Sequence, residues 1–129
     1  MGPLLFNMFI NDIFQVVHYS NIDLFADDCK IYMKILGVVD SLKLQADLNN
    51  VYNLINSNKL EINRSKCEKI TFSRKNKLII FDYNILDSTI NSVKKVRDLG
   101  VILDQHWSFD DHLNNVLSKA YKALSFIKR

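Results

Sequence analysis

Hydrophobic residues change their spacing twice along this 129-residue chain, which divides it into helical and extended segments. Near the start they recur three or four positions apart, which predicts a helix that begins near Pro3. Its apolar positions are Leu5, Met8, Phe9, Ile13, Val16 and Val17. A β-hairpin is predicted next, with Asn21–Phe25 as its first segment and Cys29–Ile35 as its second. In the second segment Cys29, Ile31, Met33 and Ile35 take alternate positions, as in a strand that is buried on one face. Because helical spacing later returns, the pattern predicts an α+β fold.

Two more helices are expected. The first opens at Gly37 and Asp40–Ser41 and ends in the polar segment 56–59. Its apolar stripe consists of Leu44, Leu48, Val51, Leu54 and Ile55. The second starts at the capping-box-like pair Ser108 and Asp111. Its stripe consists of Leu113, Val116, Leu117, Ala120, Leu124 and Ile127.

Between these helices the sequence predicts strands. Two short ones are expected at Leu60–Ile62 and Lys69–Ser73. A meander is expected beyond the basic loop 74–77, with strands at Ile79–Leu86, Thr89–Arg97 and Leu99–Leu103. No repeat or linker interrupts the chain, so a single domain is expected over residues 1–129.

The tip of the predicted hairpin carries the most informative residues, Phe25-Ala26-Asp27-Asp28. Two adjacent carboxylates repel one another and resist burial unless a positive group holds them. Magnesium would do so, because it prefers carboxylate oxygens. The alternative is an ordinary turn, since Asp is a common turn former. These four residues alone favour the ordinary turn.

Further segments change that preference. Taken in order with Phe25–Asp28, they are Gly2–Asp12, Leu44–Leu48, Asn58–Cys67, Asp98–Asp104, and then Phe109 with His112. In this order and spacing the chain resembles the reverse transcriptase domain of non-LTR (LINE-like, jockey-type) retrotransposons. Gly2–Asp12 resembles the second half of polymerase motif B, Phe25–Asp28 motif C, and Asn58–Cys67 motif D. Cys29 and Cys67 stand where the family usually has Thr.

The resemblance implies a partial polymerase palm, an antiparallel hairpin with packed helices, which runs into the start of the thumb at about residue 109. It implies transfer of deoxynucleotides to a DNA primer on an RNA template. Asp27 and Asp28 would then be catalytic residues and ligands of Mg²⁺, with Mn²⁺ as an alternative ion. The family's third carboxylate belongs to motif A, which is not in this chain. We therefore expect a fragment from motif B onward that is catalytically incomplete and holds the ion weakly.

Other residues acquire candidate roles in the same way. Lys66 matches the motif D lysine that acts as a proton donor near the leaving pyrophosphate; the alternative is a solvated lysine. Leu99, Gly100 and Val101 match the region that supports the primer end; the alternative is an ordinary hairpin. The basic pair Arg74–Lys75 would contact phosphate, or would simply be solvated. Two side chains near the last helix are given no role in catalysis: Trp107 is interpreted as a hydrophobic staple rather than a base-stacking residue, and His112 as a surface or capping residue.

Composition fits this interpretation without requiring it. Hydrophobic residues make up 48% of the chain, which disfavours disorder, and the net charge of +3 suits a phosphate-rich partner among others. The two cysteines form no CxxC or Cys/His cluster. The sequence shows no membrane span or signal peptide, so we expect an intracellular protein of nucleus or cytoplasm, not a secreted one.

Two function hypotheses therefore remain. The first is a fragment of an RNA-directed DNA polymerase, and the second is a non-catalytic nucleic-acid-binding or protein-interaction remnant of the same fold. In both cases the truncated face would leave a strand edge and apolar residues uncovered, including Leu5, Phe9 and Ile13, which would favour self-association or aggregation.

Overall fold

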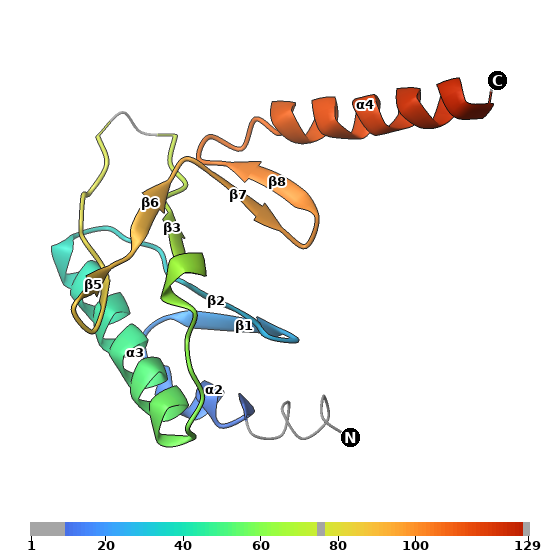
Figure 1. The fold of residues 1–129 in the computed structure, drawn as a ribbon. Coiled ribbons are helices and arrows are strands. Elements are labelled where there is room, and N and C mark those ends of the chain that lie inside the picture. Colours follow the sequence, from blue (N-terminus) through green and yellow to red (C-terminus); the bar gives the residue numbers. More distant parts are fainter. Residues whose placement is uncertain (1–9, 75–76, 128–129) are drawn as a thin grey trace. The chain divides into compact units, whose positions relative to one another are not determined.

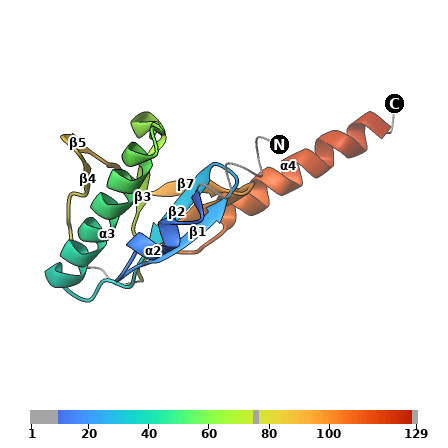
Figure 2. The same ribbon diagram turned by 90° about the horizontal axis from the view of Figure 1, so that it is seen from below.

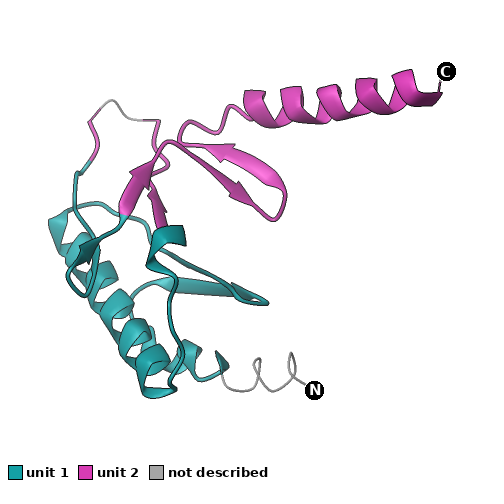
Figure 3. Cartoon of the chain, in the orientation of Figure 1, with its two compact units in different colours: residues 1–67, 79–90 teal, residues 68–78, 91–129 magenta. Residues whose placement is uncertain are grey.

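The computed structural model describes residues 10–74 and 77–127, which fall into two compact units (Figure 3). The first unit contains the chain up to Cys67 together with residues 79–90, and the second contains residues 68–78 and the chain from Asn91 onward. Within the described residues, three helices accompany pairs of short strands (Figure 1). The fold is therefore α+β, as the changes in hydrophobic spacing predicted.

The hairpin of the first unit forms at the predicted place. Strand β1 (Asn21–Phe25) pairs antiparallel with β2 (Asp28–Tyr32), and Phe25 lies opposite Asp28. Alternate residues of β1 are half-buried. The alternation predicted for the second strand is wrong at its start, where Cys29 is exposed and the neighbouring Lys30 and Ile31 are both half-buried. The loop contains only Ala26 and Asp27, and Ala26 has a φ of 52°, which is uncommon for a residue with a Cβ. Strand β2 ends at Tyr32, before the predicted Ile35.

Helix α3 (Val38–Ser57) starts and ends close to the predicted bounds. The Asp40 carboxylate accepts hydrogen bonds from the backbone N–H of Leu36 at 2.9 Å and of Gly37 at 3.2 Å, which satisfies donors at the start of the helix. Helix α2 (Ile13–Val16) packs on α3, where Ile13 is 0% and Val51 is 3% exposed. The expectation that Ile13 is uncovered is therefore wrong, because α3 covers it. The earlier part of the first predicted helix, including Leu5, Met8 and Phe9, lies outside the described residues.

A small hairpin completes the first unit. Strands β4 (Asn84–Ile85) and β5 (Ser88–Thr89) pair antiparallel around the loop Leu86–Asp87. The Gln45 side chain of α3 donates to the Asn84 carbonyl at 2.8 Å and accepts from the Asn84 N–H at 2.9 Å. The Gln45 carboxamide thus forms the pair of hydrogen bonds that the backbone of a neighbouring strand would form with Asn84. Together with Tyr83, Ile85 adds the buried apolar side chains of this segment.

The second unit contains one parallel and one antiparallel strand pair. Strand β3 (Glu68–Ile70) pairs parallel with β6 (Asn91–Val93). Strand β7 (Lys95–Asp98) pairs antiparallel with β8 (Val101–Asp104). The two long strands predicted at Ile79–Leu86 and Thr89–Arg97 are therefore wrong, because these segments break into short strands, of which β4, β5 and β7 pair with a neighbouring hairpin partner and β6 pairs with the distant β3. The strand predicted at Leu99–Leu103 is formed in large part by β8. The predicted strand at Leu60–Ile62 is also wrong; these residues are irregular, since two apolar residues on either side of Glu61 do not make a strand without a partner.

Helix α4 (Asp110–Ile127) begins two residues after the predicted Ser108. Its first turns contact β8 and β7: the Ile102 N–H donates to His112 Nδ1 at 3.4 Å, and Lys95 forms an ion pair with Asp111. The rest of α4 extends away from the β7–β8 hairpin (Figures 1 and 2). Its apolar stripe is consequently exposed, and no residue of α4 is buried. None of the described helices has both the length and the hydrophobicity needed to cross a lipid bilayer.

Candidate functional site

The two aspartates lie at the tip of the β1–β2 hairpin. Asp27 is the second loop residue and Asp28 is the first residue of β2, and both are exposed. Phe25, opposite Asp28, is 60% exposed. The tip therefore presents two neighbouring carboxylates to solvent. Carboxylate oxygens are the ligands that Mg²⁺ prefers, so the donor chemistry fits this ion.

A buried aspartate positions this hairpin. Asp47 of α3 is 0% exposed and accepts three backbone hydrogen bonds from the segment just before β1: from His18 at 2.9 Å, Tyr19 at 2.8 Å and Ser20 at 2.7 Å. The Ser20 hydroxyl donates a fourth at 2.8 Å. Burial opposes ionisation of Asp47, but these hydrogen bonds outweigh it and lower its pKa. The ionised carboxylate thus fixes the chain that enters β1.

Lys66, the candidate proton donor, lies in the short 3₁₀ helix η1 (Arg64–Lys66) and is exposed. The next residue, Cys67, directs its thiol to the Asn63 carbonyl at 3.5 Å. Burial raises the pKa of Cys67, and it raises the pKa of Cys29 to about 11 although part of the Cys29 surface is exposed. The charge of Cys67 adds to the shift at Cys29, so the two thiols lie within electrostatic range.

This proximity connects two of the sequence segments. Cys29 follows Asp28 directly, and Cys67 follows Lys66 directly. The structure therefore brings the segment of the two aspartates near the segment of the candidate lysine. Both thiols are neutral near pH 7, which argues against a thiolate nucleophile at this place.

The candidate nucleic-acid residues lie in the second unit. Leu99 and Gly100 form the two-residue loop between β7 and β8, with φ of 46° and 85°. Both are exposed, whereas Val101 is half-buried in β8. Arg74 is exposed, and Lys75 lies outside the described residues. The turn expected at Gly100 is confirmed; contact of these residues with nucleic acid stays a prediction.

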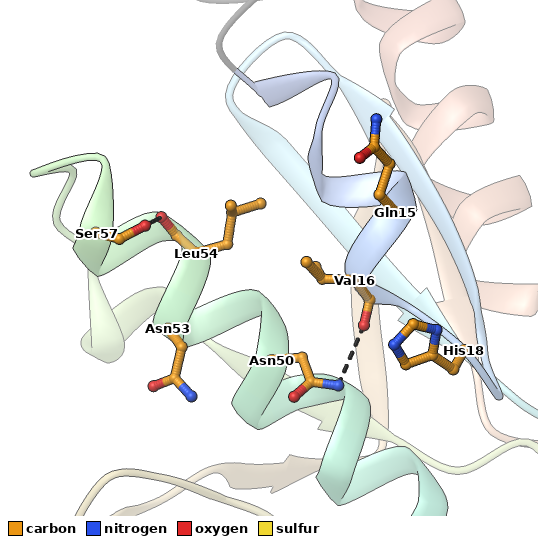
Figure 4. Close-up of a pocket in the computed structure, with 7 residues that line it drawn as sticks. All are labelled: Gln15, Val16, His18, Asn50, Asn53, Leu54 and Ser57. Carbon is orange, nitrogen blue, oxygen red and sulfur yellow. Dashed lines mark hydrogen bonds between the residues drawn. The ribbon is translucent and has the colours of Figure 1, made fainter.

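Within residues 10–74 and 77–127, no group of three or more His, Cys, Asp or Glu side chains is placed to hold a metal ion. The two aspartates alone therefore give an incomplete set of ligands. An open pocket of about 400 Å³ lies elsewhere in the first unit, between α2 and α3 (Figure 4). It is lined by Gln15, Val16, His18, Asn50, Asn53, Leu54 and Ser57, none of which is a predicted site residue.

Sequence reasoning missed two aspartates that shape the loops. Asp47 lies on the apolar stripe of α3, three residues after Leu44 and four before Val51, and a lone charge on such a stripe was the available signal. Asp104 accepts hydrogen bonds from the loop before α4 at distances of 2.8–3.2 Å. Its signal was a polar turn between a strand and a helix, a pattern too common to single it out.

Comparison of the sequence with known families gives a match. Residues 1–103 match the family model described as Reverse transcriptase (RNA-dependent DNA polymerase). Since this match covers most of the chain, the chain belongs to the reverse transcriptase family. The searches of curated proteins and of solved structures returned no significant match.

Proposed function

We propose that this chain supplies the catalytic hairpin of a non-LTR retrotransposon reverse transcriptase, and that it transfers nucleotides only when joined by a further acidic segment. The observation that carries the proposal is the pair of exposed carboxylates, Asp27 and Asp28, at the tip of a two-residue hairpin loop in a chain of this family. The motif-like segments between Gly2 and Asp104 support the non-LTR assignment.

In this proposal Asp27 and Asp28 hold Mg²⁺, or Mn²⁺ in its place. The bound ions would activate the primer 3′ hydroxyl and stabilise the charge of the leaving pyrophosphate. The described residues offer no third acidic ligand at this place. We therefore assign the missing carboxylate to a segment outside the described residues.

The chain's own residues would do the remaining work. Asp47 fixes residues 18–20 and thereby the strand that leads to the aspartates. Lys66 is exposed on η1 and would deliver a proton to the leaving group. An RNA template, a DNA primer and deoxynucleoside triphosphates are the proposed partners.

Metal binding tests the assignment of the ligands. Two carboxylates complete only part of an octahedral shell, so Mg²⁺ titration should perturb the Asp27 and Asp28 carboxyl resonances only in the millimolar range or above. Asp27→Asn should abolish the perturbation. Asp87→Asn is the matched control, because Asp87 is also the second residue of a two-residue hairpin loop, after a residue of positive φ. Micromolar binding that survives Asp27→Asn would show that other residues bind the ion.

Primer extension tests the function itself. The 129-residue chain should extend no DNA primer on an RNA template with Mg²⁺ or Mn²⁺. Addition of the motif A segment of a related element should produce extension that Asp27→Asn abolishes and Asp87→Asn preserves. Extension by the chain alone, lost in Asp27→Asn, would contradict the claim of incompleteness. Nucleic-acid binding without extension in the completed chain would instead favour a non-catalytic remnant.

A further inference from the structure

Three aromatic side chains form a partly exposed stack in the second unit. The ring centroids of Phe72 and Trp107 are 4.3 Å apart, with an angle of 27° between the rings. Phe109 lies 5.9 Å from Trp107 at 45°. Phe72 remains 38% exposed and Trp107 44% exposed. A tryptophan that serves only to close a core would keep less of its surface in water, because its apolar area is large.

The loop that presents Trp107 is held firmly. The Asp104 carboxylate accepts hydrogen bonds from the N–H groups of His106 at 2.9 Å, Ser108 at 3.0 Å and Phe109 at 3.0 Å. Burial opposes ionisation of Asp104, yet these bonds and the Ser108 hydroxyl lower its pKa to about 2. At neutral pH the Asp104 carboxylate, which forms a clasp around the loop through these bonds, is therefore fully charged. It holds Trp107 and Phe109 at a φ of 59° each, a conformation that residues with a Cβ adopt only when their surroundings impose it.

A second set of bonds joins the segment of Phe72 to this loop. The Ser73 N–H donates to the Gln105 carbonyl at 3.0 Å, and His106 Nδ1 lies 3.3 Å from the Ser73 carbonyl oxygen. The Gln105 N–H donates to the Lys94 carbonyl at 3.1 Å. The stack is thus a preorganised surface, which loses little conformational freedom when a ligand binds.

Two basic residues lie on the segments that carry the stack. Arg74 follows the Phe72–Ser73 segment, and Lys94 is tied to Gln105 at the base of the loop; both side chains are exposed. Asp111 pairs with Lys95, whereas Asp104, which accepts from backbone N–H groups, and Asp110, in the first turn of α4, keep their negative charges. A nucleic-acid ligand is therefore indicated by the aromatic rings and not by a surplus of positive charge. Exposed aromatic rings flanked by basic side chains are typical of surfaces that bind single-stranded nucleic acid by base stacking.

We propose that Phe72 and Trp107 form a platform on which an unpaired base of single-stranded RNA or DNA stacks, with Arg74 and Lys94 near the adjoining phosphates. This platform deepens the proposed function, because it names a contact with the nucleic-acid partner. It does not depend on the metal site.

The fluorescence of Trp107 reports on the platform directly, because it is the chain's single tryptophan. A single-stranded oligo-dT or oligo-U should quench this fluorescence saturably in the presence of a metal chelator. A duplex of the same length should quench much less, because its bases are already stacked on one another. The chelator removes the metal, so quenching would persist even if the assignment of Asp27 and Asp28 failed. Absence of quenching at saturation, as judged by anisotropy of a labelled oligonucleotide, would overturn the platform.

Variants separate stacking from folding. Loss of one stacked base is worth about 1–3 kcal/mol, so Trp107→Leu and Phe72→Leu should each weaken binding of labelled oligonucleotide about fivefold or more. Trp107→Phe should retain most of the affinity. Tyr121→Leu is the control, since Tyr121 is an aromatic residue on α4 that is 69% exposed. Affinity equal to that of the wild type in Trp107→Leu, with an unchanged circular dichroism spectrum, would contradict the proposal.

Salt dependence tests the basic residues. Arg74→Gln should reduce the slope of log affinity against log salt by about 1 and leave the quenching at saturation unchanged. Tyr121→Leu should leave both values unchanged. An unaltered slope in Arg74→Gln would remove the phosphate contact from the proposal.

Discussion

Each unit of the molecule contains an aspartate that closes a loop with the same kind of bonds. Asp47 accepts from the N–H groups of His18, Tyr19 and Ser20 and from the Ser20 hydroxyl. Asp104 accepts from three backbone N–H groups, including that of Ser108, and from the Ser108 hydroxyl. The two aspartates differ in how far along the sequence their partners lie. The partners of Asp47 are 27 to 29 residues away, and those of Asp104 are two to five residues away.

This difference separates two uses of one chemistry. Asp47 is fully buried between α3 and the segment before β1, so it connects elements that would otherwise not be joined. Asp104 is half-buried and acts within its own loop. Removal of Asp47 should therefore disturb the fold of its unit, whereas removal of Asp104 should release only the loop before α4.

The largest effect is expected for Asp47→Asn. The substitution removes the charge and replaces one carboxylate oxygen by an NH₂ group that cannot accept, so part-buried donors such as the Tyr19 and Ser20 N–H groups lose their acceptor, each at a cost of about 1–3 kcal/mol. We expect the free energy of unfolding to fall by roughly 3 kcal/mol or more. Urea unfolding followed by circular dichroism measures it, with exposed Asp82→Asn as the control. A loss of unfolding free energy equal to that of Asp82→Asn would contradict the role of Asp47 in joining the elements of its unit.

A smaller and more local effect is expected for Asp104→Asn. Amide hydrogen exchange should accelerate at His106, Ser108 and Phe109, because these N–H groups lose their charged acceptor. Exchange in α3 should not change. Quenching of Trp107 by oligonucleotide should weaken, since the loop is no longer fixed. Protection at Ser108 and Phe109 equal to that of the wild type would show that the clasp is dispensable.

Acidification should affect both clasps with the same sign. Each carboxyl has a folded-state pKa below its ordinary value of 3.8, so its contribution to stability is present above about pH 4 and is lost as the pH falls. For Asp104 the loss runs from pH 3.8 to about 2. The difference in loop protection between the wild type and Asp104→Asn should shrink across this window. A constant difference down to pH 2 would contradict the ionised clasp.

The smallest effects are expected from the serine hydroxyls. Ser20→Ala removes a bond to a buried carboxylate and should cost about 1 kcal/mol. Ser108 is exposed, so water can replace its hydroxyl, and Ser108→Ala should cost less than Ser20→Ala. Comparison of the two variants by thermal unfolding tests whether burial increases the contribution of a serine hydroxyl to stability. A greater loss in Ser108→Ala would reverse the expected order.

Sequence patterns correctly predicted the elements whose hydrogen bonds join residues close together in the sequence. The hairpin that carries Asp27 and Asp28 formed as expected, because alternation and a polar tip specify it within twelve residues, Asn21–Tyr32. Helix α3 followed its apolar period and its Asp40 cap. Predictions failed where a partner lay far away: the parallel pairing of β3 with β6 could not be inferred from Glu68–Ile70 alone.

The same division applies to the candidate site. The sequence by itself determined the pair Asp27–Asp28, the change between helical and extended periods, and the segments on which membership of the family rests. Only the tertiary structure decided that Asp47 holds the strand before the aspartates, that Cys29 lies near Cys67, and that Trp107 stacks on Phe72. The physical reason is that periods and turns depend on neighbouring residues, whereas a clasp or a stack depends on which distant segments the fold brings together.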